Sequence, residues 1–365
     1  GKPTILFVSD VADFKGGAER SLFDAMATPG ITPILVVPDH GPISAAAEDK
    51  DIAVMPISLG AVESVRRPFK LRDILRTFRS GLTAAIQLKR IAKQSNCAAI
   101  HTNGLNAHGV ACLARLIGGR RVIAHFRAIP FTLNERLFWR AVQIIAYRLI
   151  FVSRPCWPWA ALPANGTVIF NGIDLPVVPT VPQHKTPLTL GFTGRLHPSK
   201  HVDKLIDWVA HTHDSGNDDI RLIIRGQAED AAYERELRAL VQERGIAHMC
   251  TFEGKKEGLA AIYKDIDICV VPSITPDPLP RAVMEGQALG IPVIAYPAGG
   301  ITDMIEDEVN GFLVTDRDEF HTVLSRIIND KDLYSAIGKA AQDNAKRNFS
   351  LQTLHEKLAA IYKSL

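Results

Sequence analysis

The sequence lacks an apolar run long enough to cross a bilayer. The stretch "AVQIIAYRLIFV" at 141–152 is interrupted by Gln143 and Arg148, and it is shorter than the roughly 20 residues that a spanning helix needs. No charged segment followed by an apolar one precedes the first strand-like run at Thr4. Together these absences predict a cytoplasmic protein.

Cysteine is scarce, and neither sign of charge is in large excess. With 42 Lys and Arg against 39 Asp and Glu, the formal charge is +3, which is too small to indicate a nucleic-acid partner by itself. The cysteines are odd in number and widely spaced, which argues against a disulfide framework and against a CxxC metal site. We expect reduced core residues at Cys97, Cys112, Cys156, Cys250 and Cys269.

Low-complexity segments are absent too. Apolar residues make up 47% and charged residues 22%, as in folded globular proteins, and 365 residues suffice for two domains. Short aliphatic runs such as "TILFVS" and "LTLGFT" alternate with helix-compatible stretches, which is typical of parallel strands with crossover helices. Because the alternation occurs twice, the sequence predicts an α/β fold with two units.

Proline punctuates the middle of the chain. The segment at 174–187, "DLPVVPTVPQHKTP", holds four prolines, which cannot support a central strand or helix and favour a stiff, extended conformation. The "NGID" that begins at residue 171 predicts a turn that ends the first sheet. We therefore place a linker at 176–187, after a first domain at 1–175.

Open parallel sheets bind ligands outside the carboxyl ends of their strands, so the residues that follow strands are candidates. After the first strand-like run, Gly16 and Gly17 lead into a helix whose amides would suit an anionic or hydroxylated ligand. The alternative is that Gly-Gly only makes a turn. The GxGxxG spacing of a dinucleotide site is absent from both halves, which disfavours an NAD oxidoreductase.

Two cations follow the first strand of the second half. Gly194 ends that strand, and Arg195 and Lys200 flank a proline-containing loop before a helix. Arginine offers a planar fork of donors and lysine a point charge, so the two can hold a diphosphate. The alternative is that both are solvated surface residues.

Two carboxylates lie around the start of a later helix. Pro280 fits the first position of a helix that continues to Leu289, with Asp277 in the loop before it and Glu285 inside it. The carboxylates could accept hydrogen bonds from sugar hydroxyls while the helix amides face a phosphate. Acidic residues are common in first helical turns, so the spacing alone does not establish a sugar site.

In chain order, "GGAER", "VIFNGID", "GRLHPSK", "VVPS", "ALGIPVIA" and "GGITDMI" resemble the family 4 (group 1) retaining glycosyltransferases, and the resemblance covers nearly the whole chain. It implies the GT-B fold, in which two Rossmann-like domains face a cleft. The acceptor site then lies mainly in the first domain and the nucleotide-sugar donor site mainly in the second, at 188–348. The helix at 349–365 is expected to cross back and pack on the first domain.

The resemblance also implies roles for single residues. Arg195 and Lys200 would bind the donor diphosphate, Glu285 would bind the ribose hydroxyls, and Asp277 would contact the transferred sugar. His125, in "VIAHFR", would face the sugar from the first domain in a catalytic role, with a structural strand-end histidine as the alternative. Further donor-binding candidates are Gly16, Gly17, Gly194, Gly254, Lys255, Leu279, Arg281 and Ala282.

The chain departs from the family pattern in the second half. The family has Glu where this chain has Asp277 and Asp303, and "DPLP" replaces its E-x-F-G, with Pro280 in the glycine position. An Asp withdraws its carboxylate by about 1.5 Å relative to a Glu, and prolines remove backbone donors. Donor choice and catalytic competence are the properties that these departures put in question.

A DxD pattern, as metal-dependent transferases use, occurs four times, at 49–51, 265–267, 316–318 and 330–332, each outside a convincing nucleotide-binding context. We therefore expect no catalytic metal, and no cofactor besides the nucleotide-sugar substrate.

A basic cluster lies at 66–93, where nine Lys or Arg residues stand against one acid, Asp73, and apolar residues recur at helical spacing. Such a surface could rest on anionic lipid, and the alternative is a helix packed on the core with solvated arginines. The "RLFWR" at 136–140 is a second candidate for an interfacial patch, again with core packing as the alternative.

We therefore predict a metal-independent, retaining hexosyltransferase. It would move a sugar from a UDP- or GDP-sugar to an acceptor hydroxyl on a glycan or lipid-linked acceptor in bacterial polysaccharide, lipopolysaccharide or glycolipid synthesis. It would be cytoplasmic, peripheral on the inner face of the cytoplasmic membrane, and without a nucleic-acid partner. The alternatives are a GT-B epimerase or sugar-phosphate synthase, and a catalytically silent sugar-nucleotide-binding protein.

Overall fold

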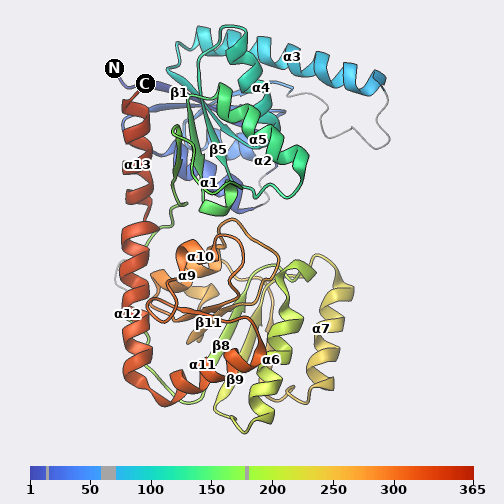
Figure 1. Ribbon diagram of the computed structural model, residues 1–365, viewed down its shortest axis with the longest axis vertical. Coiled ribbons are helices and arrows are strands. Elements are labelled where there is room, and N and C mark those ends of the chain that lie inside the picture. Colours follow the sequence, from blue (N-terminus) through green and yellow to red (C-terminus); the bar gives the residue numbers. More distant parts are fainter. Residues whose placement is uncertain (14–15, 59–70, 177–180) are drawn as a thin grey trace. The chain divides into compact units, whose positions relative to one another are not determined.

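The computed structural model describes residues 1–13, 16–58, 71–176 and 181–365, and for 71–78 it describes the backbone alone. The chain forms two compact units, the first of Gly1–Gly172 with Leu351–Leu365 and the second of Ile173–Ser350. Each unit contains one parallel sheet with helices around it (Figure 1). The predicted α/β class with two Rossmann-like sheets is confirmed.

The first unit has a seven-stranded sheet in the order β3-β2-β1-β4-β5-β6-β7. Its central strands are buried on both faces, which explains the continuous apolar run Ile5–Val8 of β1. The edge strand β3 was not predicted, although its residues belong to the apolar run 52–57. All four of its residues are exposed or half-buried, as is typical of an edge strand. The strands are β1 Thr4–Ser9, β2 Thr32–Val37, β3 Ala53–Pro56, β4 Ala99–Asn103, β5 Arg121–Phe126, β6 Arg148–Phe151 and β7 Gly166–Val168.

Helices cover both faces of this sheet. Ala99 of β4 packs in the core formed with α1, α2 and α13, whereas Thr102 of the same strand contacts His108 of α4 on the opposite face. The helices α3, α4 and α5 are neighbours in that order on the α4 side. Their bounds are α1 Gly17–Met26, α2 Pro42–Glu48, α3 Leu71–Gln94, α4 Leu105–Leu116, α5 Leu133–Ile145 and α13 Leu351–Lys363, with a 3-10 turn at Arg154–Cys156.

The C-terminal helix α13 belongs to the first unit. Leu354, Leu358 and Tyr362 recur every fourth residue, and their common face is buried in the core of that unit. The return of the last helix to the first domain, which the resemblance implied, is therefore confirmed.

The predicted tight turn at 171–174 is not formed. Instead, Ile173 makes a parallel bridge with Ser350, and its N–H donates to the Phe349 carbonyl oxygen at 2.8 Å. Gly172 is needed for close packing, because a Cβ there would lie 2.9 Å from the Leu351 Cα. The Asn-Gly pair thus lets the chain pass directly beside the start of α13.

The second unit has a six-stranded parallel sheet in the order β10-β9-β8-β11-β12-β13. The strands are β8 Leu188–Thr193, β9 Ile220–Arg225, β10 Cys250–Glu253, β11 Ile268–Val271, β12 Val293–Ala295 and β13 Phe312–Leu313. The helices are α6 Val202–Asp214, α7 Ala231–Glu243, α8 Leu259–Ile262, α9 Arg281–Ala288, α10 Ile301–Met304, α11 Arg317–Asn329 and α12 Lys331–Asn348, with a 3-10 turn at Pro198–Lys200.

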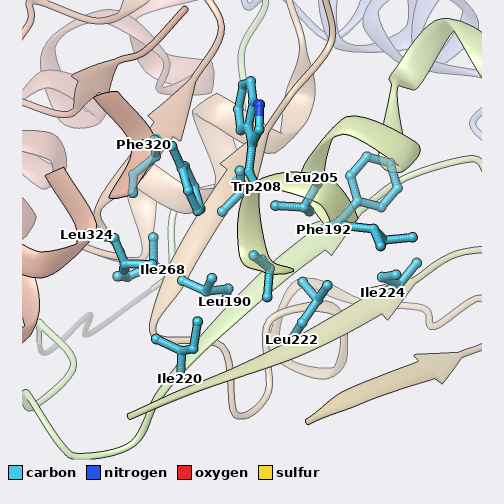
Figure 2. Close-up of a cluster of buried hydrophobic side chains, with 14 of the residues drawn as sticks. Leu190, Phe192, Leu205, Trp208, Ile220, Leu222, Ile224, Ile268, Phe320 and Leu324 are labelled. Carbon is cyan, nitrogen blue, oxygen red and sulfur yellow. The ribbon is translucent and has the colours of Figure 1, made fainter. Parts of the chain in front are cut away.

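The core of the second unit lies between its sheet and helices α6 and α11. Leu190 and Leu222 project from adjacent strands toward Leu205 of α6 and Leu324 of α11, as Figure 2 shows. Trp208 of α6 packs on Phe320 of α11 with ring centroids 5.4 Å apart, and this packing fixes the strands whose ends carry the predicted donor site.

The described part of the predicted linker, 181–187, lies on the second unit. His184 Nε2 is 3.0 Å from the Ile327 carbonyl oxygen, and Lys185 Nζ is 3.2 Å from the Asp267 carboxylate.

Two expectations from composition can also be compared with the structure. None of the five cysteines forms a disulfide, and four of them are buried. Among the residues described, no helix combines the length and apolar character that crossing a bilayer requires.

Candidate functional site

The strands of the second unit end level with one another. In the register of β8, β9 and β10, Thr193 lies beside Arg225, and Arg225 lies beside Glu253. Because the strands are parallel, their carboxyl ends share one edge of the sheet, which is where open α/β sheets bind ligands. The predicted donor-site residues of the second unit follow the ends of β8, β10 and β11.

Glycine allows two of the loops at this edge to touch. Gly194 follows β8 with a φ of +152°, and its N–H donates to the Arg225 carbonyl oxygen at 3.0 Å. Gly226 follows β9, and a Cβ at that position would overlap the Gly194 carbonyl oxygen. The two loops can therefore lie side by side only with glycine at 226.

Lys200 and Asp277 form an ion pair at this edge. Lys200 Nζ lies 2.8 Å from Asp277 Oδ2, and each side chain is 26% exposed. Asp277 Oδ1 accepts the Leu279 N–H at 3.1 Å, and the Asp277 carbonyl oxygen accepts the Gly300 N–H at 2.8 Å. The loops after β8, β11 and β12 thus meet around one pair of opposite charges.

The Glu285 carboxylate, on α9, is engaged on both oxygens. Oε2 accepts the Tyr263 hydroxyl at 3.1 Å, and Oε1 accepts Arg281 Nε–H at 3.1 Å. The Tyr263 oxygen also lies 3.1 Å from the Thr193 Oγ1 and 3.3 Å from the Ala282 carbonyl oxygen. Burial raises the pKa of Tyr263 well above its ordinary value, so the phenol keeps its proton and donates to the carboxylate.

The helix that carries Glu285 starts one residue later than expected. Pro280 is the cap residue, with a φ of −66° and a ψ of 120°, and Arg281 is the first helical residue. Within the described chain, Arg281 Nη1 is buried and makes no hydrogen bond. This nitrogen is a donor left over beside the Glu285 carboxylate.

Sequence reasoning did not identify Tyr263, Thr193 or Arg225. Arg225 is buried, its guanidinium is paired with Glu253, and it holds the segment that carries Tyr263. Its Nη1 donates to three carbonyl oxygens of that segment: Ala261 at 3.3 Å, Ile262 at 2.7 Å and Lys264 at 3.0 Å. A signal was present, because β9 and β10 each end in a charged residue directly before a glycine, which is unusual for buried parallel strands.

Of the other predicted donor-site residues of the second unit, Leu279 is buried and Ala282 is half-buried, whereas Arg195, Gly254 and Lys255 are exposed. Arg195 is 69% exposed and pairs with Glu229. Lys255 is 66% exposed, with Nζ 3.4 Å from Glu257 Oε1. Gly254 follows β10 directly and has open space where a Cβ would be. The ion pairs of Arg195 and Lys255 join solvated side chains and therefore contribute little to holding these two residues in place.

In the first unit, Gly16 caps α1 and Gly17 begins it. The Gly16 N–H donates to the Glu19 carboxylate at 2.8 Å, so this amide of the predicted anion site is already paired within its own helix. Asp10, directly after β1, accepts the N–H groups of Asn106 at 2.9 Å and Ala107 at 2.5 Å. It therefore caps α4.

His125 is fully buried near the end of β5. Its Nδ1 lies 3.1 Å from His101 Nε2 and 3.3 Å from Arg127 Nη2. Its Nε2 is buried and has no hydrogen-bond partner among the residues described. Arg127 also donates to the side-chain amide oxygens of Asn103 and Asn171.

Burial dominates the titration of these groups. It lowers the pKa of His125 well below the ordinary value, and the positive charge of Arg127 lowers it further. The same two causes lower the pKa of His101 to about 3. Burial also lowers the pKa of Arg127, to about 10, which leaves the guanidinium charged at neutral pH.

The candidate membrane surfaces are described only in part. Arg66, Arg67 and Lys70 lie outside the described residues, as do the side chains of Arg72 and Arg76. Further along α3, Arg79, Arg90 and Lys93 are exposed, whereas Lys89 Nζ donates to the Ile117 carbonyl oxygen.

The "RLFWR" segment on α5 has two faces. Trp139 is 3% exposed, and its Nε1–H donates to the Cys156 carbonyl oxygen at 2.9 Å, so this residue belongs to the core. Leu137 is 59% exposed, and it lies between Leu133 and Ile144, which are 71% and 79% exposed, along the outer face of the helix.

The chain is similar to a known family in its second half. Residues 179–344 match the family model described as glycosyl transferases group 1. A D-inositol 3-phosphate glycosyltransferase from Stackebrandtia nassauensis is 31% identical over 182 residues, which make up 47% of this chain and 41% of the relative. The chain therefore spans less than half the length of this curated relative.

Solved structures are similar along the whole chain. HepE from Anabaena, in complex with UDP, superposes with a TM-score of 0.81 at 22% identity, covering 99% of this chain and 100% of that one. The same protein has been solved with UDP-glucose, with a TM-score of 0.76. A glycosyltransferase from Rickettsia africae gives 0.79 at 19% identity, covering 100% of this chain and 98% of that one. At these identities the similarity establishes a shared fold.

Proposed function

On the premise that residues 179–344 match the glycosyl transferases group 1, we propose that the protein transfers a sugar from a nucleotide-diphosphate donor to an acceptor hydroxyl. UDP-hexose is the first donor to test, because HepE, which shares the fold, has been solved with UDP and UDP-glucose. We further propose retention of the anomeric configuration and an acceptor on a lipid-linked or growing bacterial glycan.

The Lys200–Asp277 pair is the observation that carries this proposal. A lysine and an aspartate 2.8 Å apart at the strand-end edge are partly exposed, so a ligand can reach both of them. The diphosphate of the donor would take the ammonium group, and a sugar hydroxyl would take the carboxylate. Donor binding would thus replace one ion pair by two contacts to different parts of the same substrate.

Charge develops on the departing diphosphate while the anomeric carbon becomes oxocarbenium-like. Lys200 would stabilise that charge most, and Arg195 would contribute less, because it is 69% exposed and already paired with Glu229. Glu285 is poorly placed as a nucleophile, since Tyr263 and Arg281 occupy both of its oxygens. We therefore assign deprotonation of the acceptor hydroxyl to the leaving phosphate, on the same face of the sugar.

Glu285 would instead bind the ribose. Its carboxylate has lone pairs beyond the two that Tyr263 and Arg281 use, and 13% of its side chain is exposed. The hydroxyl of Tyr263 and the Nε–H of Arg281 hold the carboxylate in one orientation, so ribose hydroxyls would meet a preorganised acceptor.

The charge distribution supports contact with anionic lipid. Residues 64–173 contain 17 Lys and Arg against two acids, Asp73 and Glu135, a formal charge of +15. The whole chain carries +3, so the remaining residues carry 3 − 15 = −12. Helix α5 of the basic segment exposes Leu133, Leu137 and Ile144, and apolar side chains next to cations suit a membrane interface.

The proposal is tested by incubating the protein with UDP- and GDP-hexoses, with and without a bacterial lipid extract as acceptor. Nucleotide release that depends on the extract, with an α-configured product from an α-configured donor, is the expected result. Binding without hydrolysis or transfer would instead identify a silent sugar-nucleotide-binding protein. A free epimerised sugar would identify an epimerase, and a sugar phosphate formed from a phosphorylated sugar would identify a sugar-phosphate synthase.

A further inference from the structure

Four polar side chains form a buried chain through the core of the first unit. The Tyr362 hydroxyl of α13 is 2.8 Å from His101 Nδ1, and His101 Nε2 is 3.1 Å from His125 Nδ1. Arg127 Nη2 approaches that same His125 nitrogen at 3.3 Å. Tyr362, His101 and His125 are each at most 3% exposed, so water does not compete for these contacts.

Arg127 determines the direction of every hydrogen bond in the chain. A guanidinium can only donate, so His125 Nδ1 must present its lone pair. His101 Nε2 is then the N–H that donates to the same lone pair. His101 Nδ1 is left unprotonated and accepts the Tyr362 O–H. The opposite direction would place a His125 Nδ1–H against an Arg127 N–H, two donors 3.3 Å apart.

With this direction of the hydrogen bonds, the proton on His125 Nε2 has no acceptor among the described residues. A neutral His125 whose Nδ1 accepts must carry its proton on Nε2, and that atom is buried without an acceptor in the described residues. A buried donor without a partner is destabilising, and a catalytic role is one of the explanations for such a group in a native protein. An oxygen of a ligand is the acceptor that would satisfy it.

The environment keeps the imidazoles neutral. Burial and the Arg127 charge both lower the pKa of His101 and of His125. Phe7 stacks on His101 with ring centroids 4.9 Å apart, which fixes the plane of that ring. Burial raises the pKa of Tyr362, so its hydroxyl keeps its proton and remains a donor to His101.

We infer that Tyr362 and His101 are positioning residues that hold His125 in the Nε2–H tautomer, so that in the sugar transfer His125 serves as a hydrogen-bond donor to a substrate oxygen and not as a general base. The role of His125 in sugar transfer rests on the proposed function. The tautomer of His125 does not, because it is a property of the protein without substrate.

The tautomer is read directly by long-range nitrogen–proton correlation NMR of the protein labelled with ¹⁵N-histidine, with His125 assigned through the His125→Gln variant. The expected spectrum shows a protonated Nε2 and an unprotonated Nδ1 for His125, unchanged between pH 6 and pH 8. A protonated Nδ1 at His125 would overturn the inference whether or not any transferase activity is found.

The donor role is read by comparing His125→Gln with His125→Ala. The side-chain amide of Gln can place an N–H where Nε2–H was, whereas Ala cannot. We expect His125→Ala to lower kcat by about 10² to 10³, as removal of a preorganised donor does, and His125→Gln to recover most of that loss. Equal losses in the two variants would contradict a donor role, because an amide cannot act as a base. If the wild-type protein transfers no sugar at all, the proposed function fails and the donor role fails with it, while the NMR result still decides the tautomer.

The positioning role has a matched control on the same helix end. Tyr362→Phe removes the hydroxyl that donates to His101 Nδ1. We expect kcat to fall by about three- to tenfold with KM unchanged, which is the effect of one net hydrogen bond. Tyr147→Phe removes a hydroxyl that donates to the Ser364 carbonyl oxygen at 3.0 Å. This hydrogen bond anchors the polypeptide just after α13 and does not involve the histidines. Equal kcat values for Tyr362→Phe and Tyr147→Phe would show that the hydrogen bond between Tyr362 and His101 does no more than anchor α13.

Discussion

Lys200 and Asp277 are 77 residues apart in sequence, yet their charged atoms lie 2.8 Å apart where the loops after β8 and β11 meet. Both side chains keep 26% of their surface exposed. A pair of this kind is not needed for stability, because partly exposed ion pairs contribute about 0 to 1 kcal/mol. In the proposed function, the pair offers a substrate two different groups to engage.

The Asp277→Asn substitution should separate binding from turnover. The new side-chain amide would keep an oxygen that accepts the Leu279 N–H, but it would no longer neutralise Lys200. We expect the Kd for UDP to change by less than about threefold, since the ammonium becomes fully available. We expect kcat to fall by about 10², the lower end of the cost of losing one preorganised electrostatic contact in a transition state. Calorimetry with UDP and a steady-state assay give the two quantities, and equal changes in both would contradict the assignment of Asp277 to the sugar.

Replacement of Tyr263 by Phe should disturb the ribose site alone. The change removes the hydroxyl that donates to Glu285 Oε2, at a cost to stability of about 1 kcal/mol. Glu285 would lose its fixed orientation, so affinity for UDP should fall while affinity for pyrophosphate stays constant. A parallel loss of pyrophosphate affinity would show that Tyr263 supports the whole edge and not the ribose contact.

The sequence predicted every strand of the two sheets except β3 from apolar runs, because a parallel strand buried on both faces leaves that signature. It predicted Lys200, Asp277 and Glu285 as candidates from their positions after strands and around a helix start. Their partners could not be predicted. Tyr263 reaches Glu285 and Gly300 reaches Asp277 only through the packing of loops that are distant in sequence.

The turn predicted at 171–174, which is not formed, shows the same limit. Asn171 and Gly172 have strong turn propensity, and their conformation is instead set by pairing of Ile173 with Ser350, far along the chain. Tertiary pairing overrode local preference at the point where the chain returns to the first unit.

The three buried histidines of the first unit should make its stability depend on pH. Burial lowers the pKa of His101 and of His108 to about 3, and the pKa of His125 also lies well below 6.5. Between about pH 3 and pH 6.5 the unfolded chain therefore binds protons at these sites that the folded chain does not, so the free energy of unfolding falls as pH falls. Each histidine contributes at most about 1.4 kcal/mol per pH unit, so the three together contribute at most about 4 kcal/mol per pH unit.

This dependence can be measured by urea unfolding between pH 5 and pH 6.5, followed by tryptophan fluorescence, because three of the four tryptophans lie in the first unit. His101→Gln should reduce the slope by about a third. A free energy of unfolding that does not change over this interval would contradict the neutral state of the histidines.

The apolar face of α5 should contribute to membrane binding. Burial of a leucine or isoleucine side chain contributes about 1.5 to 3 kcal/mol, so Leu137→Ser with Ile144→Ser should weaken binding at least tenfold. Co-sedimentation with vesicles of equal parts phosphatidylglycerol and phosphatidylcholine measures this, and binding should decrease with added salt. Val309→Ser is the matched control, since Val309 is 47% exposed on the second unit. Equal binding by the double variant and the control would exclude α5 as the contact.

The central claim, that the strand-end edge of the second unit binds a nucleoside diphosphate through Lys200, is tested most directly by calorimetry with UDP and with uridine. Lys200→Ala should weaken UDP binding by about 10- to 150-fold, the worth of a hydrogen bond to a charged group, and leave uridine binding unchanged. Arg326→Ala is the control, because it removes an exposed cation that pairs with Glu308 on the same unit. UDP binding that is as tight in Lys200→Ala as in Arg326→Ala would contradict the account.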